Sequence, residues 1–265
     1  MITFDLLVND QMDAAQGRQS EHGLSIYAEV TRPGGAERIM LDTGQHVRTL
    51  RGNIGGSVDL GRLTAVVVSH GHYDHSGGLG LIAEAGARCP VFVGPDIDRR
   101  RYSAQIGADG TLGKMRKQIG MPEPELLRAM DVRRVEGVVE ASESLTLFTL
   151  PTDAPPNPRL MAADMASPDN FSDELFAIVS DGDEEWLFGG CTHHGLPMLL
   201  EFVFTTLGKS RLAGFIGGLH LQGRTKAEIE AVADIAAKYD IVQWRPLHCT
   251  GDEAQEVWRK RFRSA

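Results

Sequence analysis

The feature that most constrains this chain is a cluster of three histidines and an aspartate directly after a run of β-branched residues. The run TAVVVS at residues 64–69 has a continuous apolar centre, which is typical of a strand buried on both faces. The next segment places His70, His72, Asp74 and His75 in the pattern H-x-H-x-D-H. At this chain's composition the pattern arises by chance in roughly one sequence per thousand, so it indicates a chemical role.

The residue types in this cluster predict a metal site. Imidazole nitrogens and carboxylate oxygens are the usual ligands of zinc and related divalent ions. In extended or turning backbone, His70 and His72 project to one side and can share one ion, while Asp74 and His75 come round to a neighbouring position. We therefore expect one or two divalent ions, with zinc first and manganese or iron as alternatives, because such a site accepts each of them.

Further ligands are expected from three histidine groups far along the chain. The motif GGCTHHG supplies Cys191, His193 and His194, the motif GGLH ends at His220, and the motif PLHC supplies His248. Each group lies just past an expected strand, as residues that line one sheet edge do. His193 and His248 are predicted ligands, His194 is expected to point away from His193, and Cys191 is either a ligand or a small buried residue.

Apolar runs and helical segments alternate along most of the chain. We expect strands at residues 2–8, 24–30, 38–44, 64–69, 91–94, 144–150, 174–180, 185–190, 212–218 and 240–244. We expect helices at residues 47–54, 78–86, 125–130, 196–206 and 226–238, and a last helix from Thr250. Thr225 with Glu228, and Thr250 with Glu253, have the spacing of a capping box. Strand clusters followed by helices, twice over, predict two packed sheets with helices outside, in a single domain over residues 1–265.

The alternation of apolar runs and helical segments weakens at residues 95–131, which are rich in Gly, Arg, Lys, Met and Pro. A long irregular segment inside a compact domain is more often a functional lid or substrate loop than a plain connection, and a disordered excursion is the alternative. Arg99 and Arg101 in this segment, together with His22 near the start, are candidate substrate-binding residues, although an arginine run is usually a solvated surface.

Charge and cysteine content narrow the function classes. A net charge of -9 argues against a general affinity for nucleic acid or anionic membranes, which need a basic surface. The chain shows neither a basic leader with an apolar core nor an apolar run of roughly 20 residues, so we expect a cytoplasmic protein with a small-molecule substrate. Three cysteines, odd in number and far apart, predict reduced thiols. The oligomeric state stays open.

These motifs, in this order, resemble the metallo-β-lactamase superfamily. The H-x-H-x-D-H motif after an apolar strand is its signature, and LDTG at residues 41–44 resembles its preceding motif, in which the aspartate braces the metal loop. FGGC and PLHCTG stand where its later ligand motifs stand. The resemblance implies an α+β fold, a four-layer αββα sandwich with the metals at one edge of the paired sheets. EHGLS, GGCTHHG and GGLHL are further similar to the branch of dihydropterin/ribofuranosylaminobenzene-phosphate synthase-like metal-dependent hydrolases.

The chain departs from the superfamily in its first metal position. The superfamily usually takes a third histidine for that ion from the middle of the chain, yet no histidine occurs here between His75 and His193. We expect His193 to replace it. A single ion or an atypical pair of ions remains open.

Three functional hypotheses follow from the resemblance. The first is a hydrolase in which metal-activated water attacks a small anionic substrate of the ester, phosphodiester or lactone class, with Asp74 and His220 as catalytic residues. Asp74 holds an ion and orients the water, while His220, if not a ligand, gives a proton to the leaving group. The second is a metal-dependent condensing enzyme that acts on a dihydropterin-like substrate, with Tyr102, Phe171 or Trp244 lining its pocket. The third is a non-catalytic, metal-stabilised binding protein, although structural zinc sites rarely need so many ligands.

Overall fold

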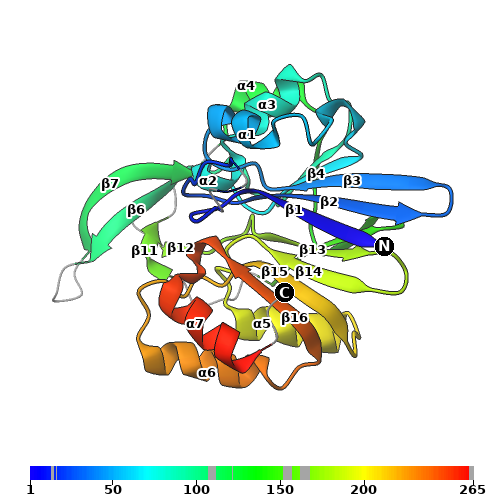
Figure 1. The fold of residues 1–265 in the computed structure, drawn as a ribbon. Helices are drawn as coiled ribbons and strands as arrows, with labels where there is room; N and C mark the ends of the chain where they lie inside the picture. The colour runs from blue at the N-terminus through cyan, green and yellow to red at the C-terminus, as the bar shows by residue number, and fades with distance from the viewer. Residues whose placement is uncertain are drawn as a thin grey trace.

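Two six-stranded sheets form the centre of the molecule (Figure 1). The computed structural model describes residues 1–12, 15, 17–106, 112–120, 122–151, 157–161 and 168–262. The first sheet runs in the order β1 (Ile2–Val8), β2 (Ser25–Arg32), β3 (Gly35–Leu41), β4 (Ala65–Val68), β5 (Val91–Val93), β8 (Val132–Arg134). The second runs in the order β16 (Ile241–Leu247), β15 (Leu212–Gly218), β14 (Glu185–Gly189), β13 (Leu175–Ser180), β10 (Leu145–Thr149), β9 (Val138–Ser142).

Helices cover the outer face of each sheet, so the layers follow the order helix, sheet, sheet, helix (Figure 1). The first sheet carries α1 (Val47–Ile54), α3 (Leu79–Glu84) and α4 (Pro124–Ala129). The second carries α5 (Leu196–Glu201) with the π-helical turn Phe202–Thr206, α6 (Lys226–Ala236) and α7 (Asp252–Arg261). The four-layer sandwich predicted from the sequence is confirmed. Within the described part of the chain, no helix is both long enough and apolar enough to span a bilayer.

Three apolar clusters hold these layers together, and strand β4 contributes to two of them. Ala65 and Val67 pack into the cluster between the two sheets, while Val66 and Val68 pack into the cluster beneath α1 and α3. Alternate residues of a strand point to opposite faces, so a strand with apolar layers on both sides needs apolar residues throughout. The continuous apolar run before His70 is therefore a consequence of the layered fold.

A third sheet lies beside the sandwich, where the sequence suggested only an irregular lid. Its order is β12 (Pro168–Asp169), β11 (Asn157–Met161), β6 (Arg101–Ile106), β7 (Leu112–Gly120), and the β6–β7 hairpin extends away from the main sheets (Figure 1). The irregular interpretation of residues 95–131 is wrong for β6 and β7, because a small hairpin pairs through its backbone and leaves little apolar periodicity to read. Residues 107–111 and 121 of the expected lid lie outside the described residues. Gly120 pairs with His72, so the hairpin borders the metal loop.

The two capping-box predictions have different outcomes. At α6 the Thr225 side chain accepts from the backbone of Glu228, whose carboxylate accepts from the Thr225 backbone, as predicted. At the last helix the prediction is wrong, since α7 begins at Asp252 and Thr250 lies in the preceding 3-10 turn, His248–Thr250. The Thr250 hydroxyl donates instead to the carbonyl of Leu247. The hydroxyl therefore stabilises the turn that carries His248 and does not cap α7.

Candidate metal centre

The predicted ligands meet at one edge of the two sheets because each follows the carboxyl end of a strand. His70 comes after β4, His193 after β14, His220 after β15 and His248 after β16. Strands β14, β15 and β16 are mutually parallel, so the segments that follow them emerge at the same edge. Asp74 and His75 arrive on α2 (Tyr73–Ser76), a single helical turn that the sequence did not predict.

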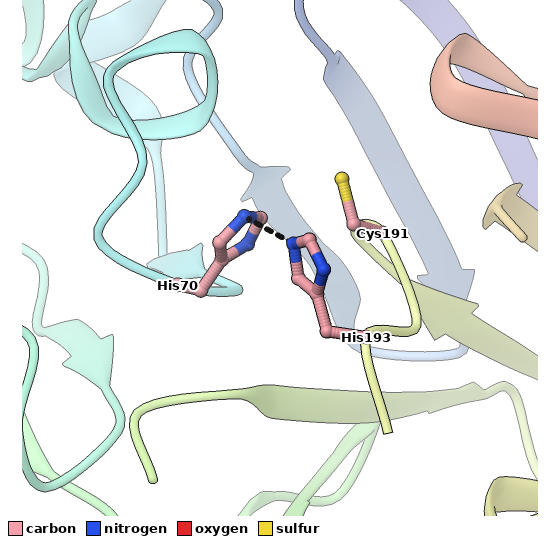
Figure 2. Close-up of side chains that lie close together, drawn as sticks. All are labelled: His70, Cys191 and His193. Carbon is pink, nitrogen blue, oxygen red and sulfur yellow. Dashed lines mark hydrogen bonds between the residues drawn. The ribbon is translucent and has the colours of Figure 1, made fainter. Parts of the chain in front are cut away.

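The first ligand group consists of His70, Cys191 and His193, whose ligand atoms all lie within 4.8 Å of one another. Figure 2 shows a nitrogen of the His70 ring directed at a nitrogen of the His193 ring. The two Nε2 atoms lie 3.3 Å apart, and the ring planes are nearly perpendicular. On its far side, His70 Nδ1 lies 2.9 Å from Ser69 Oγ, and that hydroxyl donates to Asp42 Oδ2 at 2.7 Å. The serine oxygen therefore accepts a hydrogen bond from His70 Nδ1–H, which leaves the lone pair of His70 Nε2 directed at the group.

The second group consists of His75, Cys191 and His248, so Cys191 belongs to both. His75 Nδ1 lies 2.6 Å from Asp42 Oδ2, and its Nε2 lies 3.2 Å from the Cys191 sulfur. His248 Nε2 lies 3.3 Å from Asp74 Oδ2. The Cys191 sulfur thus lies between two clusters of imidazole, and carboxylates behind the rings of His75 and His248 fix their orientation.

Burial keeps the inner histidines in the form that binds a cation. Burial holds the pKa of His70 and of His193 well below the ordinary value and lowers the pKa of His72 to about 3. Burial alone would raise the pKa of Asp74, but the charge of His75 and hydrogen bonds from His22 and His248 hold it well below its usual range. His70, His72 and His193 are therefore neutral imidazoles beside an ionised carboxylate. Burial lowers the pKa of His248 as well, but the charge of Cys249 and hydrogen bonds to Asp10 and Asp74 raise it well above its ordinary value.

Unpaired buried nitrogens provide a test of whether a metal fits these residues. His72 Nε2, His193 Nδ1 and His220 Nδ1 are buried and have no hydrogen-bond partner among the described residues. Buried polar atoms without partners are costly unless something else satisfies them. Imidazole, carboxylate and thiol are also the donor types that zinc takes. The residues therefore fit one or two divalent ions.

Backbone strain concentrates at the same place. Five non-glycine residues in the described ranges have a positive φ: Asp42, Phe171, Thr192, His220 and His248. Each belongs to the site or touches it, since Phe171 stacks on the His193 ring at 3.9 Å between ring centroids and the Thr192 hydroxyl donates to the carbonyl of Gly218. Such conformations cost free energy and persist where the surrounding structure holds them for function.

Comparisons with known proteins agree with this geometry. A sequence model of the metallo-beta-lactamase superfamily matches residues 24–196 of the chain. The chain belongs to the metallo-β-lactamase superfamily. Over 258 residues it is 25% identical to the 7,8-dihydropterin-6-methyl-4-(beta-D-ribofuranosyl)-aminobenzene-5'-phosphate synthase of Methanocaldococcus jannaschii, a match that covers 92% of this chain and 86% of that one.

Two solved structures share the fold of this superfamily. Tm1679, described as a metal-dependent hydrolase of the beta-lactamase superfamily, superimposes with a TM-score of 0.82 at 22% identity and covers 100% of this chain and 96% of its own. The metallo-beta-lactamase fold protein YhfI from Bacillus subtilis gives a TM-score of 0.54 at 14% identity and covers 100% of this chain and 95% of its own. At these levels of identity the two similarities show a shared fold.

A cavity of about 260 Å³ opens onto the ligand residues, and the predicted substrate-binding residues differ in their relation to it. His22 lies at its wall, half exposed, where hydrogen bonds to Asp10 and Asp74 raise its pKa to about 9. Arg99 is not among the lining residues. The prediction that Arg101 binds substrate does not hold here, since Arg101 is fully buried.

Arg101 instead joins three parts of the chain. Its guanidinium forms ion pairs of 2.7 Å with Asp169 and 2.7 Å with Asp173, and Asp173 accepts a hydrogen bond from the backbone of Gly71 in the metal loop. Hairpin pairing turns this side chain inward. Arginine in a run of three is usually solvated, so the pattern alone did not indicate a buried residue.

Two acidic residues that the sequence did not single out support the site. Asp10 Oδ1 lies 2.7 Å from His248 Nδ1, and Glu174 accepts hydrogen bonds from the backbone of His193 at 2.6 Å and of His194 at 3.0 Å. His194 Nδ1 also lies 2.6 Å from Glu174 and does not join the ligand groups. Asp10 follows β1 and Glu174 precedes β13. The only sign of these two residues in the sequence is therefore an acidic residue next to an apolar strand.

Proposed function

We propose that this protein is a metal-dependent hydrolase that acts on a small anionic substrate. The observation that carries the proposal is a set of imidazoles, one carboxylate and a shared cysteine sulfur at the wall of an accessible cavity. A divalent ion bound there supplies Lewis acidity and lowers the pKa of water. His70, His72 and His193 would hold one ion, Asp74, His75 and His248 the second, and Cys191 would lie between them.

Asp74 is the residue of this chain placed to orient the attacking water. It borders the cavity, and its Oδ2 is fixed between His22 Nε2 at 3.2 Å and His248 Nε2 at 3.3 Å. A carboxylate held in this way keeps a constant position during the reaction and can orient a water molecule by accepting a hydrogen bond from it. The sequence left two roles for His220, an ion ligand or a proton donor, and both are compatible with its place at the cavity wall.

An exposed lysine beside the cavity supports the anionic substrate class. The Nζ atom of Lys117, on β7, lies 4.1 Å from the centre of the Tyr73 ring, and Tyr73 lines the cavity. Its strand partner Ser103 also lines the cavity. A cation at the rim attracts negatively charged ligands over about one Debye length. We propose Lys117 for the role that the sequence gave to Arg99 and Arg101.

A condensing enzyme is the second candidate, and one observation favours it. The similarity to the archaeal synthase extends over 92% of this chain, far beyond the metal loop. A flat pterin-like ring needs an aromatic surface. Of the three aromatic residues considered, Phe171 stacks on His193 at the site, whereas Trp244 packs in the apolar cluster beneath the outer helices.

A non-catalytic binding protein fits the site less well. Structural zinc sites are closed by four protein ligands, while sites that react with substrate keep an open position. Here His72, Asp74, Cys191, His193 and His248 all line an accessible cavity.

A substrate panel separates the two enzymatic candidates. Zinc-loaded protein should cleave at least one phosphodiester, lactone, thioester or β-lactam, and Asp74→Asn should abolish that cleavage. Asp59→Asn serves as the matched control, because Asp59 caps a short turn away from the cavity. If all four classes stay intact while a dihydropterin is consumed, the condensing enzyme replaces the hydrolase.

A further inference from the structure

A third cluster of ligand-type side chains lies beside the two groups described above. Cys191, His220 and Cys249 have ligand atoms that all lie within 4.8 Å of one another. They follow the neighbouring parallel strands β14, β15 and β16, which accounts for their meeting. The proposed hydrolase has no role for Cys249.

The two thiols and the ring are held in position by their surroundings. The Cys249 sulfur lies 3.8 Å from the carbonyl of Cys191, and the thiol has hydrogen-bond contact with the His220 ring. A Cβ atom on Gly218 would lie 2.6 Å from the Cys249 sulfur, so this strand residue must be glycine for the thiol to lie where it does. His220, whose ring belongs to this cluster, adopts a strained backbone conformation with a φ of 50°.

The donor set suits a thiophilic ion better than either of the other groups does. Tetrahedral zinc with bond lengths of about 2.0 Å to nitrogen and 2.3 Å to sulfur places its ligand atoms about 3.3 to 3.8 Å apart, a spacing that this cluster can accommodate. Two sulfurs and one imidazole also favour soft or borderline ions over magnesium, calcium or manganese. All three residues line the cavity, which leaves a fourth position open to it.

We propose that Cys191, His220 and Cys249 form a third metal-ligating group, which binds a thiophilic ion such as zinc and shares the Cys191 sulfur with the neighbouring groups. This inference rests on the proposed function, because it adds ligands to the same centre. His220 is then a ligand, and Cys249 gives the centre a second sulfur.

Cobalt(II) substitution tests the inference, since each thiolate bound to cobalt adds sulfur-to-metal charge-transfer absorption. We expect cobalt-loaded wild-type protein to show the intensity of two thiolates and Cys249→Ser to lose about half of it. Cys89→Ser is the matched control, because Cys89 is buried in the cluster beneath α1 and α3. Cys249→Ala replaces the serine variant if the buried hydroxyl unfolds the protein. An unchanged spectrum in the folded Cys249 variant would overturn the inference.

The same titration distinguishes failure of the inference from failure of the proposed function. If wild-type protein binds cobalt and cleaves substrate while the Cys249 variant keeps the full sulfur absorption, only the third group is refuted. If wild-type protein binds no cobalt, both proposals fail together. His220→Gln should shift the visible cobalt bands if His220 is a ligand, and unshifted bands would count against the inference.

Discussion

Asp42 Oδ2 lies 2.6 Å from Nδ1 of His75, and both side chains are fully buried. The same carboxylate accepts hydrogen bonds from the backbone and the hydroxyl of Ser69, and that hydroxyl contacts His70. One aspartate therefore sets the ring orientation of a histidine in each of the two ligand groups. This link from β3 to the metal loop explains why an LDTG motif accompanies the histidine cluster.

Replacing this carboxylate should weaken metal binding without removing a ligand. Asp42→Asn turns one accepting oxygen into an NH2 donor, so the side chain can no longer accept all three hydrogen bonds from the Ser69 backbone, the Ser69 hydroxyl and His75. The affinity for zinc should fall roughly 10- to 100-fold. Competition with a chromophoric chelator measures the affinity. The control Asp240→Asn changes an exposed carboxylate that lies 3.6 Å from Arg211, and its affinity should equal the wild-type value. Equal affinities in both variants would refute the orienting role of Asp42.

Gly190 should tolerate no side chain, because a Cβ atom there would lie 2.0 Å from the Ser69 hydroxyl. Gly190→Ala should push Ser69 away from His70, lower zinc affinity and destabilise the fold by about 1 to 3 kcal/mol. The matched control is Gly52→Ala in α1, where nothing lies within 4 Å of the added atom and a gain of roughly 0.5 to 1 kcal/mol is expected. Urea unfolding measures the free energy of unfolding of both variants, which should be lower than wild type for Gly190→Ala and higher for Gly52→Ala.

Arg101 should matter for stability more than for substrate binding. Arg101→Met leaves Asp169 and Asp173 buried without their partner, which should cost about 3 to 5 kcal/mol in the free energy of unfolding. The neighbouring exposed Arg100→Met should change it by less than about 0.5 kcal/mol. A wild-type unfolding curve for the Arg101 variant would show that the buried ion pairs contribute little.

Lys117 should act on substrate binding. Lys117→Ala should raise KM for an anionic substrate roughly two- to fivefold and leave kcat unchanged, because an exposed charge contributes about 0.2 to 1 kcal/mol. The difference from wild type should shrink as salt is added. Lys238→Ala is the control, because Lys238 is exposed in the turn that follows α6. An altered kcat with a constant KM would contradict a binding role.

Much of the fold and the proximity of the histidines could be predicted from the sequence, since both follow from local patterns. The helix Val47–Ile54 and strand β4 were predicted within a residue or so, because their apolar residues face layers on fixed sides. Residues after neighbouring parallel strands must meet at one edge, so the remote clusters at His193 and His248 were expected to approach the first.

Other features depend on tertiary contacts that leave no local pattern. Arg101 is buried because β6 pairs with β7 and β11, and its run of arginines gives no sign of this. Asp10 contacts His248, which lies 238 positions away in the chain. Glu174 accepts a hydrogen bond from the backbone of His194, which lies 20 positions away. Thr250 has the spacing of a helix cap, but its hydroxyl serves the His248 loop.

The metal content of purified variants tests the central proposal most directly. His72→Ala and the control His46→Ala, an exposed histidine that contacts Glu21, are dialysed with wild-type protein against the same dilute zinc solution and examined by elemental analysis. We expect wild-type protein and the His46 variant to retain the same zinc content, at least one ion per chain, and the His72 variant to retain clearly less. Zinc-free wild-type protein, or a folded His72 variant with the full wild-type zinc content, would contradict the metal centre.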